Sequence, residues 1–328
     1  KNNRYGIFWA LSASWLVSQE RFMEKQHVFS NLKARFSYGT SGKEAGADYL
    51  NYTLYRTGMT TFDYYWNHPA YQSTYAAELN QLGNDNLSWE TAHNLNIGVD
   101  MGFLGNRIAL SADWYRRLST DLIMQVTLPV AYGVGTQYQN VGEMLNRGVE
   151  LVLNTHNVKS QDFNWRSTFT FSYNDNKLKK LQDSKLDWDG GRTTLYEGDN
   201  IDVLKLVKYA GVDAETGNPL LERVEENGSI KLVNTVYEAT SGNEQLSYVD
   251  CGLRRAPYWG GFTNTFSYKN WELYVHTTYA FGFKVSDGIS REYASGRRWL
   301  SSNKRKLPSD LKVWKKAGDH ADIPMQSC

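Results

Sequence analysis

NLNIGVDMGFLGNRIALSADWYR, residues 94–116, contains two alternating segments joined by a short turn at 103–107. In the first segment, apolar side chains at every second position alternate with polar residues and glycine. In the second, residues 108–114 repeat the pattern, with Ser111, Asp113 and Tyr115 at the alternate positions. A period of two is that of a β-strand, whose successive side chains point to opposite faces. This stretch therefore predicts an antiparallel hairpin with one apolar and one polar face.

The same alternation recurs along the chain, at 32–38, 149–154, 168–173 and 271–281, and about nine such strands are expected. Connections are short at 103–107, 157–163 and 268–271, and long at about 43–87, 119–140, 177–257 and 287–328. Trp15, Trp165 and Trp271 lie near the short-turn ends, where amphipathic rings mark a membrane interface. Tight turns on one side and extended loops on the other are typical of an outer-membrane barrel.

Composition excludes several classes of function. Aromatic residues make up 14% of the 328-residue chain, and the formal net charge of +1 gives no field that would attract nucleic acid. The most apolar stretch, 5–17, is too short for a membrane helix. Six histidines and two cysteines show no metal-ligand spacing, and GTSGK at 39–43 lacks the spacing of a phosphate loop. Asp187 and Asp189 could offer oxygen to calcium, but acidic turns are usually only solvated. No metal, cofactor or catalytic residue is predicted.

Whole phrases of the chain resemble the SusC/RagA family of TonB-linked outer-membrane proteins from Bacteroidetes, in that family's order. The phrases are NNRYGIFWALSASWLVSQERFM (2–23), LKARFSYGTSG (32–42), LSWETAHNLNIGVDM (87–101), NVGEMLNRGVELVL (140–153), FNWRSTFTFSYNDNKL (163–178), YAGVDAETGNPL (209–220) and APYWGGFTNTFSYKNWEL (256–273). The chain departs from the family pattern at Trp9 and Lys43, and neither change puts the fold in doubt.

The resemblance implies an all-β fold, an antiparallel up-and-down meander that forms part of a transmembrane outer-membrane β-barrel of about 22 strands. Residues 1–328 would be a partial barrel, with the plug, the early strands and the closing C-terminal strands absent. The intact protein would lie in the bacterial outer membrane and import an oligosaccharide or peptide as the channel subunit of a SusCD-like complex. Its partners would be a SusD-like surface lipoprotein, TonB acting through the plug, and outer-membrane lipid, and it would not be an enzyme. A secreted glycan-binding β-sandwich and a surface glycan hydrolase remain the alternatives.

Strand polarity assigns candidate residues to two faces. The predicted lipid-facing residues are Leu95, Ile97, Val99, Leu110, Trp114, Leu151, Phe169, Leu273 and Val275. The predicted lumen-facing residues are Lys33, Arg35, Asp100, Asp113, Tyr115, Glu150 and His276. Rings of the long loops are candidates for ligand contact, although loop packing would also explain them: Tyr64, Tyr65, Trp66, Tyr71, Tyr75, Tyr132, Tyr138 and Trp188.

Overall fold

The computed structural model describes residues 5–44, 46, 48–56, 78–181, 185–188, 193–242, 244–285 and 311–324. The chain divides into two compact units. Unit 1 comprises residues 1–186, 195–201 and 257–281, and unit 2 comprises residues 187–194, 202–256 and 282–328. Among the described residues, no helix combines the length and apolar character needed to span a membrane.

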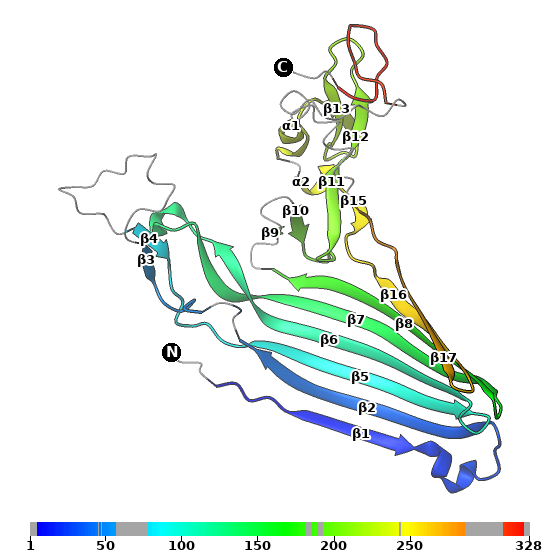
Figure 1. The fold of residues 1–328 in the computed structure, drawn as a ribbon. Coiled ribbons are helices and arrows are strands. Elements are labelled where there is room, and N and C mark those ends of the chain that lie inside the picture. The colour runs from blue at the N-terminus through cyan, green and yellow to red at the C-terminus, as the bar shows by residue number, and fades with distance from the viewer. Residues whose placement is uncertain are drawn as a thin grey trace. The chain divides into compact units, whose positions relative to one another are not determined.

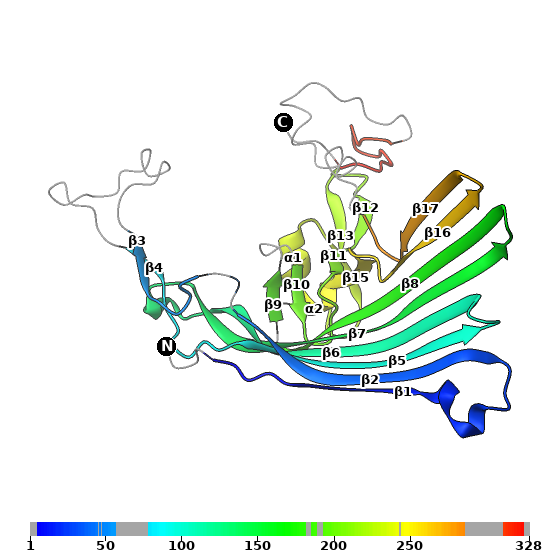
Figure 2. The same ribbon diagram turned by 60° about the horizontal axis from the view of Figure 1, so that its bottom comes forward.

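Unit 1 is built on one sheet of eight strands, in the order β1-β2-β5-β6-β7-β8-β16-β17 (Figure 1). Its strands are β1 (Ala10–Leu16), β2 (Phe29–Lys43), β5 (Glu90–Phe103), β6 (Ile108–Thr127), β7 (Thr136–Lys159), β8 (Phe163–Lys180), β16 (Tyr258–Tyr268) and β17 (Trp271–Phe281). Each strand pairs antiparallel with the next. The sheet is curved, with β1 and β17 at its two edges (Figure 2). The predicted antiparallel meander is confirmed, with eight strands in the described part of this sheet where about nine were expected.

The short connections lie at one end of the sheet. Residues 104–107 join β5 to β6, and Leu104, Gly105 and Asn106 all have positive φ. Residues 160–162 join β7 to β8, and Lys269 with Asn270 joins β16 to β17, again with positive φ at Lys269. The connection from β1 to β2 at this end is longer and holds two 3-10 turns, η1 (Val17–Gln19) and η2 (Arg21–Met23).

The long connections differ from expectation in how much regular structure they hold. The connection within 43–87 includes a strand pair, β3 (Leu54–Arg56) with β4 (Glu78–Gln81). The expected loop at 119–140 is mostly strand, because β6 continues to Thr127 and β7 begins at Thr136. Only residues 128–135 connect them, with the turn η3 (Val130–Tyr132).

A β-bulge explains why residues 119–127 of β6 lose the simple alternation seen in the first part of that strand. The register of β6 on β7 shifts between Ser119 and Leu122, and Asp121 has a φ of 55°. The side-chain amide of Asn140 donates to the carbonyl of Asp121 at 2.7 Å. A bulge inverts the facing of the residues that follow it. A strand that is predicted from a period of two therefore ends near residue 119, although β6 continues to Thr127.

The expected loop at 177–257 contains most of unit 2. Its elements are β11 (Val203–Val207), β12 (Tyr209–Val212), β13 (Pro219–Val224), β14 (Ile230–Val233), α1 (Val236–Thr240), α2 (Glu244–Ser247) and β15 (Tyr248–Leu253). A further pair, β9 (Lys185–Trp188) with β10 (Thr193–Tyr196), lies where the two units meet in sequence. Residues 311–324 also belong to unit 2, since the indole N–H of Trp314 donates to the carbonyl of Ala214 at 2.8 Å.

Candidate functional site

The register of unit 1 separates polar and apolar side chains onto two faces of the sheet. Arg35 lies opposite Gly98, Gly98 opposite Asp113, and Asp113 opposite Glu150, from β2 across to β7. The next row carries Phe36, Ile97, Trp114 and Val149 and points the other way. All seven residues predicted to face the lumen share the first face by register. All nine predicted to face lipid share the second.

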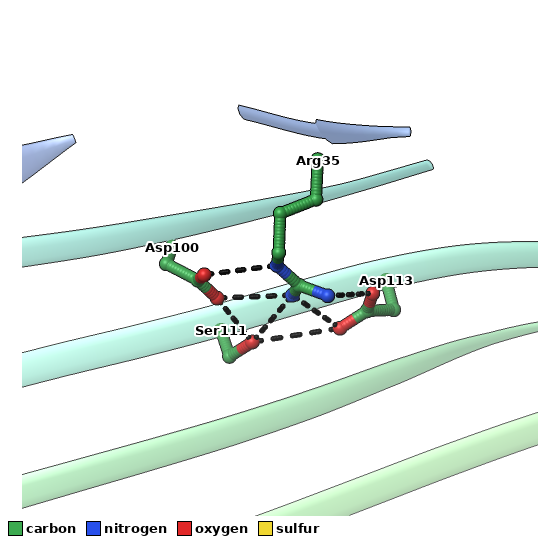
Figure 3. Close-up of polar contacts among 4 residues, drawn as sticks. All are labelled: Arg35, Asp100, Ser111 and Asp113. Carbon is green, nitrogen blue, oxygen red and sulfur yellow. Dashed lines mark hydrogen bonds and ion pairs between the residues drawn. The ribbon is translucent and has the colours of Figure 1, made fainter. Parts of the chain in front are cut away.

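Four side chains of the polar face, from β2, β5 and β6, form a charged network (Figure 3). The Arg35 guanidinium donates from Nε and Nη2 to the Asp100 carboxylate at 2.8 and 2.9 Å. It also donates from Nη1 and Nη2 to the Asp113 carboxylate, both at 2.9 Å. The hydroxyl of Ser111 accepts from Nη2 at 3.0 Å and donates to Asp100 at 2.7 Å. One cation is thus held by two carboxylates, each in the bidentate geometry that suits a guanidinium.

Glycine in β5 makes this network possible. A Cβ at Gly98 would lie 2.4 Å from Oδ1 of Asp113 and 2.8 Å from Cζ of Arg35, closer than side-chain carbons approach other atoms. The guanidinium therefore crosses β5 over Gly98 and reaches β6. Tyr115 likewise crosses a neighbouring strand over a glycine, Gly148, and its hydroxyl donates to Oδ1 of Asn174 in β8 at 2.9 Å.

Toward the long-loop end, the sheet holds a hollow of about 650 Å³. Its lining combines four asparagines with one tyrosine and residues of both charges, namely Asn94, Asn96, Asn146, Asn174, Tyr115, Lys43, Glu90, Arg117 and Glu150. Leu95 and Arg116, which lie on the apolar face by register, also border the hollow. Part of this lining is already engaged, since Lys43 pairs with Glu90 at 3.5 Å and Asn176 donates to Asn146 at 2.8 Å. Amides offer both donors and acceptors, so the hollow can hydrogen-bond a ligand rich in hydroxyl or amide groups.

The remaining residues predicted for the polar face lie apart from one another. Lys33 lies opposite Asp100, and Glu150 lies opposite Asp113, where two like charges face each other. His276 lies near the edge of the sheet, where its Nδ1 is 2.7 Å from the hydroxyl of Thr263. The structure therefore brings Arg35, Asp100 and Asp113 together and places His276 elsewhere on the same face.

Of the eight loop rings, the structure describes the side chains of two. Tyr138 lies in β7, and its hydroxyl accepts a hydrogen bond from the Gln125 amide at 2.9 Å. Tyr132 lies in the turn η3 and is 57% exposed. Trp188 lies in β9, but its side chain is outside the described part. Tyr64, Tyr65, Trp66, Tyr71 and Tyr75 lie outside the described residues, as does Asp189.

Rings gather on the apolar face at both ends of the sheet. At the short-turn end Trp165 stacks on Phe266 with centroids 5.5 Å apart, and its indole N–H donates to Asn264 at 2.9 Å. At the long-loop end Tyr173 stacks on Tyr258 at 5.0 Å, which stacks on Phe281 at 5.1 Å. From Trp165 to Tyr173 the strand rises about 26 Å, of the order of the apolar band of a membrane barrel, about 25 Å tall.

The sequence places Ser111 at a polar position but does not single it out as a candidate, nor the glycines under Arg35 and Tyr115 or the asparagines of the hollow. Asn94, Asn96, Asn146 and Asn174 occupy the polar positions of alternating strands, so the pattern did mark their face. Their gathering depends on register between strands, which one strand's alternation does not define. Within the described segments, no group of three or more His, Cys, Asp or Glu side chains is placed to hold a metal ion.

An antiparallel meander with an apolar face banded by rings, a polar opposite face, and turns that alternate between short and long defines the class of outer-membrane β-barrels. The family model described as "TonB dependent receptor-like, beta-barrel" matches residues 1–309. The chain belongs to this family of outer-membrane proteins.

Relatives and solved structures agree with that family. TonB-dependent receptor P26 of Formosa agariphila is 33% identical over 282 residues, covering 82% of this chain and 27% of the relative. TonB-dependent receptor SusC of Bacteroides thetaiotaomicron is 29% identical, covering 83% and 27%. The structure of the RagAB peptide transporter matches with a TM-score of 0.76 and 25% identity, covering 99% of this chain and 34% of that one. The chain thus spans about a third or less of the length of these proteins.

Proposed function

We propose that the full-length protein that contains this chain imports a nutrient, an oligosaccharide or a peptide, across the outer membrane. The observation that carries the proposal is the match of residues 1–309 to the TonB-dependent receptor barrel. The proposal assigns the apolar face of the sheet to lipid and the polar face to the lumen. It also places the short turns in the periplasm and the long connections outside the cell.

The polar face supports this assignment. The Arg35 network and the hollow beside it would expose charges and amides to lipid if the sheet were turned around, and such groups are costly in hydrocarbon. Toward a lumen the same groups offer hydrogen bonds to a hydrated solute. Recognition in the hollow would rest on Asn96, Asn146, Tyr115 and Arg117, since these line it together.

The partners follow from the same proposal. A SusD-like surface lipoprotein would cover the outer opening, and TonB would supply energy through a plug. The named relatives are receptors and a transporter, and we infer that this protein likewise performs no bond chemistry. The single eight-stranded sheet and the family match leave the sandwich and hydrolase alternatives without support.

The first test is fractionation of cells that express the full-length protein with an affinity tag. The expected result is recovery in the outer membrane and co-purification of a lipoprotein in detergent. A variant that fills the hollow, Asn96→Trp, should keep membrane insertion and lose most uptake. The variant Ser37→Trp, one strand away in the same row, is the matched control. Recovery in the soluble fraction without a lipoprotein would contradict the proposal.

A further inference from the structure

Cations interrupt the apolar face at the long-loop end of β6, β7 and β8. Arg116 lies opposite Arg147, and Arg147 lies opposite Asp175, so one row carries three charges across three strands. Lys177 follows two residues beyond Asp175 on the same face, opposite Leu145. All four share the face of Trp114, Val149 and Tyr173, and thus the face that the proposed function assigns to lipid.

The charges of this group do not balance. Arg147 donates to Oδ2 of Asp175 from Nε at 3.0 Å and pairs with it through Nη2 at 2.9 Å, so the one carboxylate is engaged. In the part of the chain that the structure describes, Arg116 and Lys177 make no side-chain hydrogen bond or ion pair. Two guanidinium groups directly opposite each other on a sheet repel. The group therefore carries two positive charges that lack a counter-ion.

The aromatic row beside the group fixes its depth in a membrane. Trp114 and Tyr173 lie one row closer to the middle of the strands than Arg116 and Asp175, and Tyr258 stacks on Tyr173. Rings of this kind mark the boundary between hydrocarbon and headgroups. Arg116 is then about 7 Å beyond that boundary along the strand, and Lys177 about 13 Å. Both cations lie at the level of headgroups.

We propose that Arg116 and Lys177, with Arg147 between them, bind the phosphate of a phosphorylated glycolipid in the outer leaflet of the outer membrane. Guanidinium groups bind phosphate in bidentate fashion, and a lysine adds a point charge. The 51% exposed side chain of Arg147 leaves part of its guanidinium open beside Asp175. This inference rests on the orientation given by the proposed function, but it concerns lipid and not the imported solute.

The test uses the full-length protein, delipidated and reconstituted in nanodiscs with neutral lipid. Purified lipid A is added, and the bound lipid is counted by native mass spectrometry. Dephosphorylated lipid A tests whether phosphate or acyl chains are recognised, and inorganic phosphate tests for a site for free anion. The variant Arg116→Gln/Lys177→Gln removes the two uncompensated charges. The variant Lys159→Gln/Arg166→Gln removes two cations of the polar face near the short-turn end and controls for the loss of net charge.

The expected result is binding of lipid A that the Arg116→Gln/Lys177→Gln variant weakens on the order of 30-fold, as the loss of two charges near an anionic surface predicts. The control variant should bind as the parent protein does. Equal binding of dephosphorylated lipid A, an equal loss in the control, or binding of inorganic phosphate as tight as that of lipid A would each overturn the inference. Uptake is not measured here, so a failure of import would count against the proposed function alone.

Discussion

Replacing Arg35 by glutamine removes the cation that two carboxylates share. Asp113 would then keep one weak contact, the 3.4 Å hydrogen bond from Ser111, and would still face Glu150 across the β6–β7 register. Removing one partner of a buried pair costs about 3–5 kcal/mol, and exposed pairs contribute about 0–1 kcal/mol. The side chains of Arg35, Asp100 and Asp113 are 30%, 31% and 18% exposed. An intermediate loss of about 2 kcal/mol in the free energy of unfolding is therefore expected.

The assay is unfolding of the full-length protein by urea in detergent, with tryptophan fluorescence as the signal. The triple variant Arg35→Gln/Asp100→Asn/Asp113→Asn has the same side-chain shapes as the single variant but leaves no carboxylate without a counter-ion. Most of the lost free energy of unfolding should therefore be recovered. A stability of the Arg35→Gln variant within about 0.5 kcal/mol of the parent, below the range for a group left unpaired, would refute the reasoning. So would a triple variant no more stable than the single one.

Three other substitutions address the faces, the glycines and unit 2. Leu151→Arg, on the predicted lipid face, should cost about 2–4 kcal/mol in lipid, whereas Val152→Arg on the other face should cost much less. Equal costs for the two variants, measured by urea unfolding in lipid vesicles, would contradict the facing. Gly98→Ala places a Cβ 2.4 Å from Oδ1 of Asp113 and 2.8 Å from Cζ of Arg35 and should cost about 1–3 kcal/mol by overpacking. Much of that cost should disappear in the Arg35→Ala/Asp113→Ala background, and an unchanged cost there would exclude these two side chains as its cause. In unit 2, the amide of Glu215 and the hydroxyl of Thr216 hold the pKa of Asp213 below its usual range. Amide protection of this turn should be complete above the usual pKa of an aspartate and should be lost as pH falls from there through the lowered pKa. Asp213→Asn should remove this acid step in hydrogen exchange.

The fold could be predicted from alternation because a sheet with lipid on one face and water on the other must repeat every two residues. Leu95, Ile97 and Val99 carry that signal without interruption. The last part of β6, after Ser119, could not be predicted in this way, because the bulge at Asp121 shifts the alternation of polar and apolar side chains. The small elements of unit 2, such as α1 and β14, are too short to leave a periodic signal of their own.

The candidate site was predicted as a face but not as a set of contacts. Arg35, Asp100 and Asp113 were each placed on the polar side, but their contact requires β2, β5 and β6 to pair in one register. It also requires Gly98 between them. A single glycine in a strand can mark a bulge, a bend or a close approach, so its role here could not be predicted from the sequence. The five loop rings between 57 and 77 stay predictions, since the structure does not describe them.

Side chains that cross a glycine also act on strands that share no backbone hydrogen bonds. Arg35 joins β2 to β6 over Gly98, and Tyr115 joins β6 to β8 over Gly148. On the opposite face, Tyr279 crosses Gly260 and donates to the carbonyl of Thr170 in β8 at 2.7 Å. These ties connect second neighbours directly, so part of a force applied to β2 passes to β6 through Arg35 and Asp113 and not through the hydrogen bonds of β5.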